Sequence, residues 1–123
     1  MKPQKFSIKS RLNSFKFAFN GLKIFVKEEH NSWIHLFATF CVIIAGFIFK
    51  ISAFEWIAIV FAIGLVITLE IINSSIENIA DFISPGRNDH IKKIKDLSAA
   101  GTLISAITAF IIGLIVFIPK FLN

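Results

Sequence analysis

The chain has 123 residues, of which 55% are hydrophobic and 17% are charged, and its net charge is +5. Soluble globular domains carry roughly 25% charged residues, and a domain this small leaves much of its surface exposed. The composition therefore argues against a soluble enzyme, a disordered regulator and a secreted disulfide scaffold. The single cysteine, Cys41, lies in an apolar run, so a disulfide framework and a CxxC metal site are both excluded.

The N-terminal segment, over about 6–28, is predicted to form an amphipathic helix. Its apolar residues recur at steps of four and three, and basic residues occupy the other face, which is typical of a helix lying on an anionic membrane surface. A helix that packs on the other helices would show the same pattern, and the two interpretations are compatible. No apolar core with a small-residue cleavage site follows the charged start, so a cleaved signal peptide is not expected. The apolar positions are Ile8, Leu12, Phe15, Phe19, Leu22 and Val26, and the basic ones are Lys2, Lys5, Lys9, Arg11, Lys16, Lys23 and Lys27.

Three apolar blocks follow, at about 34–49, 56–72 and 97–118. A bilayer core of ~30 Å needs about 20 helical residues, and these runs are too long and too uniform for strands. In lipid, a helix also satisfies its own backbone, whereas an open strand does not. The sequence therefore predicts an all-α protein with one membrane domain, residues 1–123. Its membrane helices are expected at about 33–50, 55–82 and 96–119.

The distribution of Lys and Arg predicts the orientation. The N-terminal segment holds seven of them, the first loop one, the second loop four (Arg87, Lys92, Lys93 and Lys95) and the C-terminal end one. By the positive-inside rule, the N-terminus and the second loop are cytoplasmic and the C-terminus is outside. The middle span then runs inwards, so its second half approaches the cytoplasm.

Polar residues form a stripe on that second half. At ~100° per residue, the carboxylates of Glu70, Glu77 and Asp81 lie within about 20° of one line, flanked by Asn73. An ionisable residue inside a span is by default a functional-site hypothesis. For Asn73, a hydrogen bond between packed helices is an equal alternative. Asp81 is expected to lie beyond the bilayer as a solvated charge.

Stacked carboxylates need a cation or a proton to relieve their repulsion. Glu70 lies in the drier setting and suits a general base, whereas Glu77, nearer water, suits a hard cation such as Mg²⁺. Mg²⁺ usually takes one or two protein carboxylates and fills its remaining positions with phosphates and water. Glu28 or Glu29, on the same side of the membrane, can supply the second carboxylate, although an ordinary interfacial charge is an alternative for both.

Other polar residues give weaker signals. Lys92 and Lys93 suit phosphates or anionic headgroups, or serve only to set topology. The three histidines, His30, His35 and His90, show no metal-ligand spacing and are interpreted as interfacial polar groups. The sequence contains no GxxxxGK[ST], GxGxxG, GxSxG, HRD or DFG motif, so phosphate chemistry would need a scaffold other than the common nucleotide folds.

The run from Glu70 to Glu77 (EIINSSIE), followed by Asp81 and by Lys95-Asp96 with small residues at 98–101, resembles the bacterial diacylglycerol kinase and undecaprenol kinase family. The similarity extends over nearly the whole chain. It implies a small lipid kinase of the bacterial inner membrane that works as a homotrimer, with active sites at subunit boundaries near the cytoplasmic interface. The implied reaction transfers the γ-phosphate of Mg-ATP to the hydroxyl of diacylglycerol or undecaprenol.

The resemblance also implies roles for individual residues. Glu70 matches the catalytic base, and Asn73 matches an amide that orients the substrate site. Glu29 and Glu77 match the glutamates that hold Mg²⁺ on ATP. Phe17 falls where members often carry a nucleotide-contacting Tyr. The matching ATP-binding positions are Phe17, Glu29, Glu77, Lys95 and Asp96.

Two other classes of function remain open. A small oligomeric transporter or proton-conducting subunit would use Glu70 as an intramembrane relay. A structural or regulatory subunit would bind anionic lipid or a partner through its basic helix. A nucleic-acid partner is not expected, because the basic residues lie at membrane boundaries. For the kinase, the segment from Glu28 to His35 is similar to the branch that phosphorylates undecaprenol.

Overall fold

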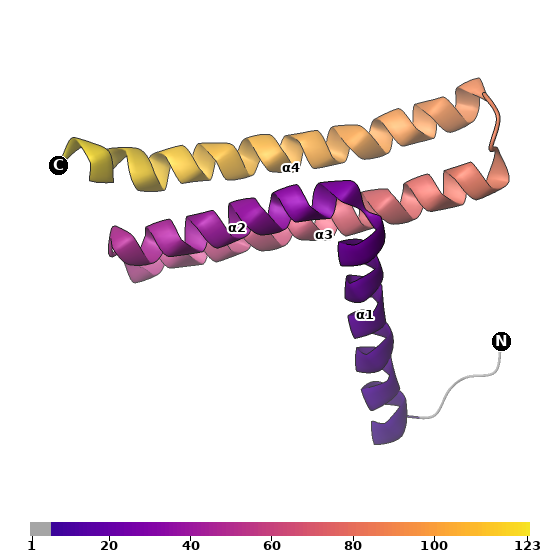
Figure 1. Cartoon of the computed structure of the whole chain (residues 1–123), viewed down its shortest axis with the longest axis horizontal. Coiled ribbons are helices and arrows are strands. Elements are labelled where there is room, and N and C mark those ends of the chain that lie inside the picture. The colour runs from indigo at the N-terminus through magenta and orange to yellow at the C-terminus, as the bar shows by residue number, and fades with distance from the viewer. Residues whose placement is uncertain (1–5) are drawn as a thin grey trace.

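The structure is a computed structural model and describes residues 6–123. Within that range the chain is all-helical (Figure 1). Its four helices are α1 (Ile8–Glu28), α2 (His30–Ile48), α3 (Ala53–Ile83) and α4 (Asp89–Leu122). The predicted all-α fold is confirmed. Lys2 and Lys5, two of the basic residues in the predicted N-terminal helix, lie outside the described residues.

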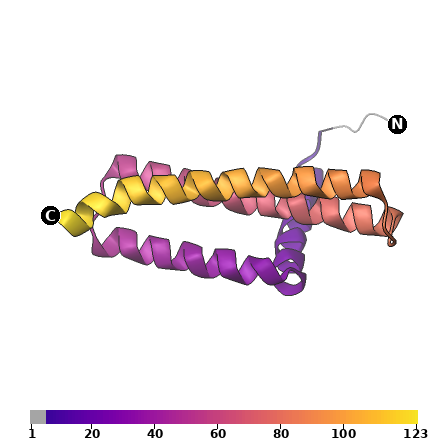
Figure 2. The same cartoon turned by 90° about the horizontal axis from the view of Figure 1, so that it is seen from above.

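Three helices form an elongated bundle. α2, α3 and α4 run alongside one another, and α1 projects sideways from the start of α2 (Figures 1 and 2). Each of the three bundle helices is long and apolar enough to cross a membrane, which confirms the three predicted spans. α3 and α4 pack against each other most extensively, and α2 packs against α3.

The turn between α2 and α3 sets the two helices antiparallel. Lys50 adopts a left-handed conformation with φ of 51°. The backbone N–H of Lys50 donates to Phe47 O at 3.3 Å, and that of Ile51 donates to Gly46 O at 3.1 Å. These two bonds close the end of α2 as a Schellman motif. Ser52 then starts α3 with a capping box in which its side chain accepts from the N–H of Glu55 and its N–H donates to the Glu55 carboxylate.

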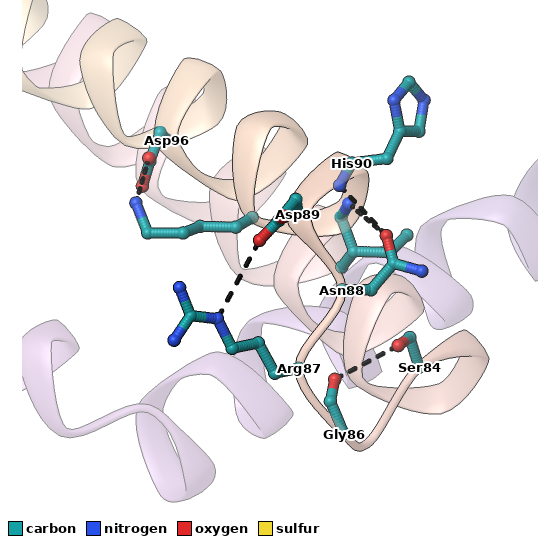
Figure 3. Close-up of polar contacts among 9 residues, drawn as sticks. Ser84, Gly86, Arg87, Asn88, Asp89, His90 and Asp96 are labelled. Atoms are coloured by element: carbon teal, nitrogen blue, oxygen red, sulfur yellow. Dashed lines mark hydrogen bonds and ion pairs between the residues drawn. The ribbon is translucent and has the colours of Figure 1, made fainter.

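The start of α4 differs from the sequence prediction. The side chain of Asn88 accepts hydrogen bonds from the N–H groups of His90 and Ile91, so α4 begins at Asp89 rather than near residue 96 (Figure 3). Lys92, Lys93 and Lys95 were predicted to lie in the second loop, and this prediction is wrong. They belong to the first turns of α4 because Asn88 provides a helix start that hydropathy does not reveal.

Helix lengths separate the two ends of the bundle. At 1.5 Å per residue, the 19 residues of α2 span ~28 Å, whereas the 31 of α3 and the 34 of α4 span ~46 Å and ~51 Å. The tight turn after α2 holds one end of α2 level with the start of α3. The excess length therefore extends past the start of α2 at the opposite end (Figure 1). That extension carries most of the charged residues of α3 and α4.

Aromatic and aliphatic side chains pack the end of the bundle near the α2–α3 turn. Ile51, Ile59 and Val116 form the buried cluster there. The ring of Phe49 lies 4.9 Å from that of Phe121. Lys120 pairs with Glu55 at 3.1 Å and ties the end of α4 to the start of α3. These contacts hold the helices together at one end of the bundle. Polar contacts join them at the other end.

The apolar stripe of α1 stays exposed. Ile8, Leu12 and Phe15 are between 63% and 73% exposed, whereas Phe25 near the end of α1 is buried. At the junction with α2, the hydroxyl of Ser32 donates to Glu29 O at 2.7 Å. The stripe therefore does not pack on the other helices of this chain. Of the two interpretations, a helix lying on a membrane surface fits this exposure better.

Replacing Gly46 with Ala should destabilise the α2–α3 pair. A methyl group at Gly46 would lie 2.5 Å from Cη2 of Trp56, whose indole packs against the buried cluster and lies 5.0 Å from the ring of Phe47. We expect a loss of about 1–3 kcal/mol from overpacking, measured by reversible unfolding in detergent micelles. Gly64→Ala is the control because nothing lies within 4 Å of its added methyl. Equal stability of the two variants would contradict the packing described here.

Candidate active site

Glu70 lies on α3 and meets His35 of α2. Its carboxylate Oε1 lies 3.1 Å from His35 Nε2, and the side chains of His35 and Glu70 are only 22% and 15% exposed. The two residues come from antiparallel helices and share one level of the bundle. A largely buried carboxylate thus lies in contact with a polar side chain from another helix, as burial of an ionisable group requires.

An apolar groove of about 430 Å³ begins at His35, the residue that contacts Glu70. It runs between α2, α3 and α4 towards the packed end of the bundle, from His35 to Val42 on α2 and from Val66 to Ile59 on α3. Small side chains of α4, including Ala106 and Ala109, leave this space open. Its walls are almost entirely hydrocarbon, and His35 and Thr39 are the polar residues among those that line it. An amphiphile with one polar end fits such a groove.

Asn73 links α3 to α4. Its Oδ1 accepts a hydrogen bond of 2.6 Å from the Ser98 hydroxyl, and its Nδ2 donates to Glu77 Oε1 at 3.5 Å. The bond from Ser98 fixes the orientation of the amide and directs its N–H₂ group towards Glu77. Both alternatives considered for Asn73 therefore have a structural basis: it joins two packed helices and it also faces a carboxylate of the stripe.

Asp81 makes a specific contact in addition to being exposed. Lys95 Nζ lies 2.6 Å from Asp81 Oδ1, and the aspartate side chain is 65% exposed. The prediction of a solvated charge is thus incomplete, because the antiparallel register of α3 and α4 places a lysine opposite it. Asp96 pairs instead with Lys92 at 2.7 Å on its own helix. Lys95 and Asp96, adjacent in sequence, therefore contact different partners.

The residues of the predicted stripe on α3 contact two different neighbouring helices. Glu70 contacts α2, whereas Asn73 and Asp81 contact α4. The sequence predicts the carboxylates on one side of α3 but does not reveal which helix each would meet. Glu70 is consequently separated in environment from Glu77, because of the two only Glu70 contacts a residue that lines the groove.

Glu29 lies level with Glu77 along the bundle. It lies six residues before His35, and Glu77 lies seven residues after Glu70 on the antiparallel helix. At 1.5 Å per residue, both are ~9–10 Å from the His35–Glu70 contact, towards the charged extension. Glu29 caps α2 without a side-chain bond, and both glutamates are half-buried.

The donor chemistry at this level fits Mg²⁺. In residues 6–123, no three His, Cys, Asp or Glu side chains converge as a metal cage. Mg²⁺ does not need one, since one or two carboxylates together with substrate phosphates and waters complete its coordination. The carboxylate oxygens of Glu29 and Glu77 are ligands of the required hard type.

Phe17 is not brought to this site. It lies midway along α1, is 71% exposed, and belongs to the helix that projects away from the bundle (Figure 1). The chain as described thus gathers Glu70, Asn73, Glu77 and Lys95 along the facing helices and leaves Phe17 apart.

Sequence reasoning missed the contacts of two site residues, His35 and Ser98. His35 was interpreted as an interfacial polar group, yet it lies five residues inside α2 and against Glu70. A histidine within an apolar run, in a chain with one carboxylate in another span, is a signal for such a pair. Ser98 was noted only as a small residue, and only the α3–α4 register reveals its partner.

Comparison with known proteins identifies the family of this chain. The family model described as "Prokaryotic diacylglycerol kinase" matches residues 16–117, which include Glu29, Glu70 and Lys95. The chain belongs to the prokaryotic diacylglycerol kinase family. As a member, it is an integral-membrane lipid kinase, which decides against the transporter and structural-subunit alternatives.

Individual relatives in the prokaryotic diacylglycerol kinase family carry two names. The chain is 35% identical over 107 residues to an undecaprenol kinase of Bacillus subtilis, covering 87% of each chain. It is 30% identical over 114 residues to a diacylglycerol kinase of Synechocystis, covering 91% of this chain and 65% of the relative. A diacylglycerol kinase of Helicobacter pylori is 34% identical over 89 residues, which cover 72% of this chain and 69% of the relative.

Replacing Ser98 with Ala should weaken the α3–α4 interface. The change removes the hydroxyl that bonds Asn73, and hydrogen bonds between membrane helices contribute roughly 0.5–1.5 kcal/mol. We expect that loss in reversible unfolding in mixed micelles. Ser75→Ala is the matched control because the Ser75 hydroxyl bonds Ile71 O within its own helix. If the two variants unfold alike, the Ser98–Asn73 bond does not join the helices.

Proposed function

We propose that this lipid kinase transfers the γ-phosphate of ATP to the hydroxyl of a membrane lipid alcohol at the cytoplasmic face of the bacterial inner membrane. The observation that supports this best is the position of Glu70, a largely buried carboxylate in contact with His35 at the polar end of an apolar groove. A lipid chain in the groove would bring its hydroxyl to the carboxylate without leaving the bilayer.

The orientation in this proposal follows from charge. α1 and the first turns of α4 carry most of the Lys and Arg residues, which favours the cytoplasmic side for them and for the end of α3 that lies beside α4. Lys50 and Lys120 are the basic residues at the opposite end of the bundle. ATP, a cytoplasmic substrate, would then reach the charged ends of α3 and α4 that extend beyond α2. The lipid would reach the groove from within the membrane.

Glu70 acts as the general base in this proposal. The lipid hydroxyl oxygen forms a bond to the γ-phosphorus, its proton passes to the Glu70 carboxylate, and the bond between γ-phosphorus and ADP oxygen breaks. Most of the rate in phosphoryl transfer comes from positioning and charge stabilisation rather than from covalent chemistry. Asn73, fixed by Ser98, would hold the substrate side of the site one turn nearer the cytoplasm.

Glu29 and Glu77 would hold Mg²⁺ together with ATP. When bound, the ion neutralises charge on the β- and γ-phosphates. Lys95 adds a positive charge close to this level, where it already attracts Asp81. Asp96 would contact the nucleotide from the exposed side of α4. Phe17 would join the site only from an α1 placed beside another subunit, since its own helix projects away.

A homotrimer is part of this proposal. Few apolar side chains are buried within one chain, and large ones such as Phe40, Phe61 and Phe110 are more than 60% exposed. Lipid covers such faces in a membrane, and so do neighbouring copies. Sites at subunit boundaries would bring the nucleotide-binding residues of one copy to the groove of another.

Undecaprenol is the acceptor that we favour, with diacylglycerol as the alternative. The match to the B. subtilis relative named undecaprenol kinase covers 87% of each chain. The match to the Synechocystis diacylglycerol kinase covers 91% of this chain but 65% of the relative. The open end of the groove faces hydrocarbon and would accept either lipid. The two acceptors should therefore be assayed side by side.

Glu70→Gln should abolish turnover and leave ATP binding intact, because the amide cannot accept the hydroxyl proton. The assay uses purified protein in detergent with γ-labelled ATP, Mg²⁺ and undecaprenol or diacylglycerol, and counts label that extracts into organic solvent. We expect a loss of at least about 10²-fold in kcat. Glu55→Gln, the same change at the far end of α3, is the control and should retain turnover. Normal phosphorylation by Glu70→Gln would refute the base assignment.

Glu77→Gln should weaken Mg-ATP binding itself, because it removes a carboxylate ligand. The expected result is a KM for Mg-ATP raised by about tenfold or more, with partial rescue at high Mg²⁺ concentration. Equilibrium binding of a fluorescent ATP analogue, with and without Mg²⁺, measures the effect directly. An unchanged affinity in Glu77→Gln would remove this residue from the metal site, whatever happens to kcat.

A further inference from the structure

We propose that His35 is the positioning residue for Glu70: its imidazole holds the carboxylate at the end of the groove and leaves one carboxylate oxygen for the lipid hydroxyl. This inference rests on the proposed function, in which Glu70 is the base. It assigns to α2 a part in the reaction beyond lining the groove.

The contact between His35 and Glu70 supports this role. His35 Nε2 lies 3.1 Å from Glu70 Oε1, a hydrogen-bonding distance, and both side chains are largely buried. With a proton on Nε2, the imidazole attracts Oε1, so Oε2 remains to accept from a substrate. His35 also lines the groove, and it thus contacts both the base and the space that a lipid would occupy.

No second polar group of the described residues competes for Glu70. The ion pairs and side-chain hydrogen bonds within residues 6–123 give Glu70 one partner, His35. Asn73, one turn away, is engaged by Ser98 and Glu77. From α4, the groove is lined by non-ionisable residues such as Ala106 and Ala109. The orientation of the carboxylate therefore depends on this one imidazole.

The energetics explain why a partner is needed. A carboxylate in a low-dielectric setting is costly unless a donor satisfies it, and without one it would turn towards water at the headgroup level. A rotation of that kind moves the accepting oxygen away from the hydroxyl, and displacement of a reacting group by ~1 Å can cost ~10²-fold in rate. His35 prevents this rotation because it reaches from α2 to the Glu70 carboxylate on α3.

The first arm of the test detects the pair without an assay of activity. The protein is labelled with ¹⁵N-histidine, and the ring nitrogens are recorded by NMR in micelles for the wild type and for Glu70→Gln. The signal of His35, assigned by its absence in His35→Gln, should shift when the carboxylate becomes an amide. The signal of His90, exposed on the first turn of α4, should not. An unshifted His35 signal would overturn the proposal.

The second arm measures kinetics with γ-labelled ATP and lipid alcohol. His35→Leu should lower kcat by about 10–100-fold and leave the KM for Mg-ATP within twofold. His35→Gln places an amide donor in reach of Glu70 and should restore most of the rate. His90→Leu is the matched control and should behave as wild type. If the role of His35 is purely structural, His35→Leu and His35→Gln will both lower kcat and both lower the unfolding midpoint. That result would also overturn the proposal.

The outcomes separate this inference from the proposed function. A wild type that phosphorylates neither undecaprenol nor diacylglycerol would refute the proposed function, and the role of His35 with it, even if the NMR arm shows the pair. An active wild type whose His35→Leu variant keeps its kcat would refute the role of His35 alone.

Discussion

Polar and ionisable side chains within the spans of this protein must find partners inside the chain, because hydrocarbon offers none. In residues 6–123, every buried side-chain nitrogen and oxygen has a hydrogen-bond partner. Two polar contacts join helices: Glu70 Oε1 lies 3.1 Å from His35 Nε2 of α2, and Asn73 accepts a hydrogen bond from Ser98 of α4. α3 is therefore held by polar contacts to both of its neighbours within one turn of its own length, and the site forms where these contacts meet.

The two ends of the bundle are stabilised by different forces. At the α2–α3 turn, aromatic rings, the Ile51–Ile59–Val116 cluster and the Glu55–Lys120 pair fix the helices. Towards the other end, small residues on α4 keep the helices from filling the space between them, which opens the groove. The groove reaches the packed end, because Ile59 of the buried cluster also lines it. A site that admits a lipid needs such an opening, because a fully packed bundle would exclude the substrate.

Length adds a second constraint. α2 matches the hydrocarbon thickness, and α3 and α4 exceed it by several turns. The excess carries Glu77, Asp81 and Lys95 out of the hydrocarbon on rigid helices rather than on flexible loops. Charged groups at the lipid boundary are consequently positioned by the same helices that line the groove. Continuity of α3 through both regions would connect the proposed lipid end of the site to its proposed nucleotide end.

The sequence by itself determined the helical class, the three spans, the amphipathic α1 and the side of α3 on which Glu70, Asn73, Glu77 and Asp81 lie, because hydropathy and the helical period are local properties. It did not determine the start of α4, which depends on the cap made by Asn88. Nor did it identify the partners of Glu70, Asn73 and Asp81. Those depend on the antiparallel register, in which residues 14 to 35 positions apart come to one level, and only the packing of whole helices against one another sets that register.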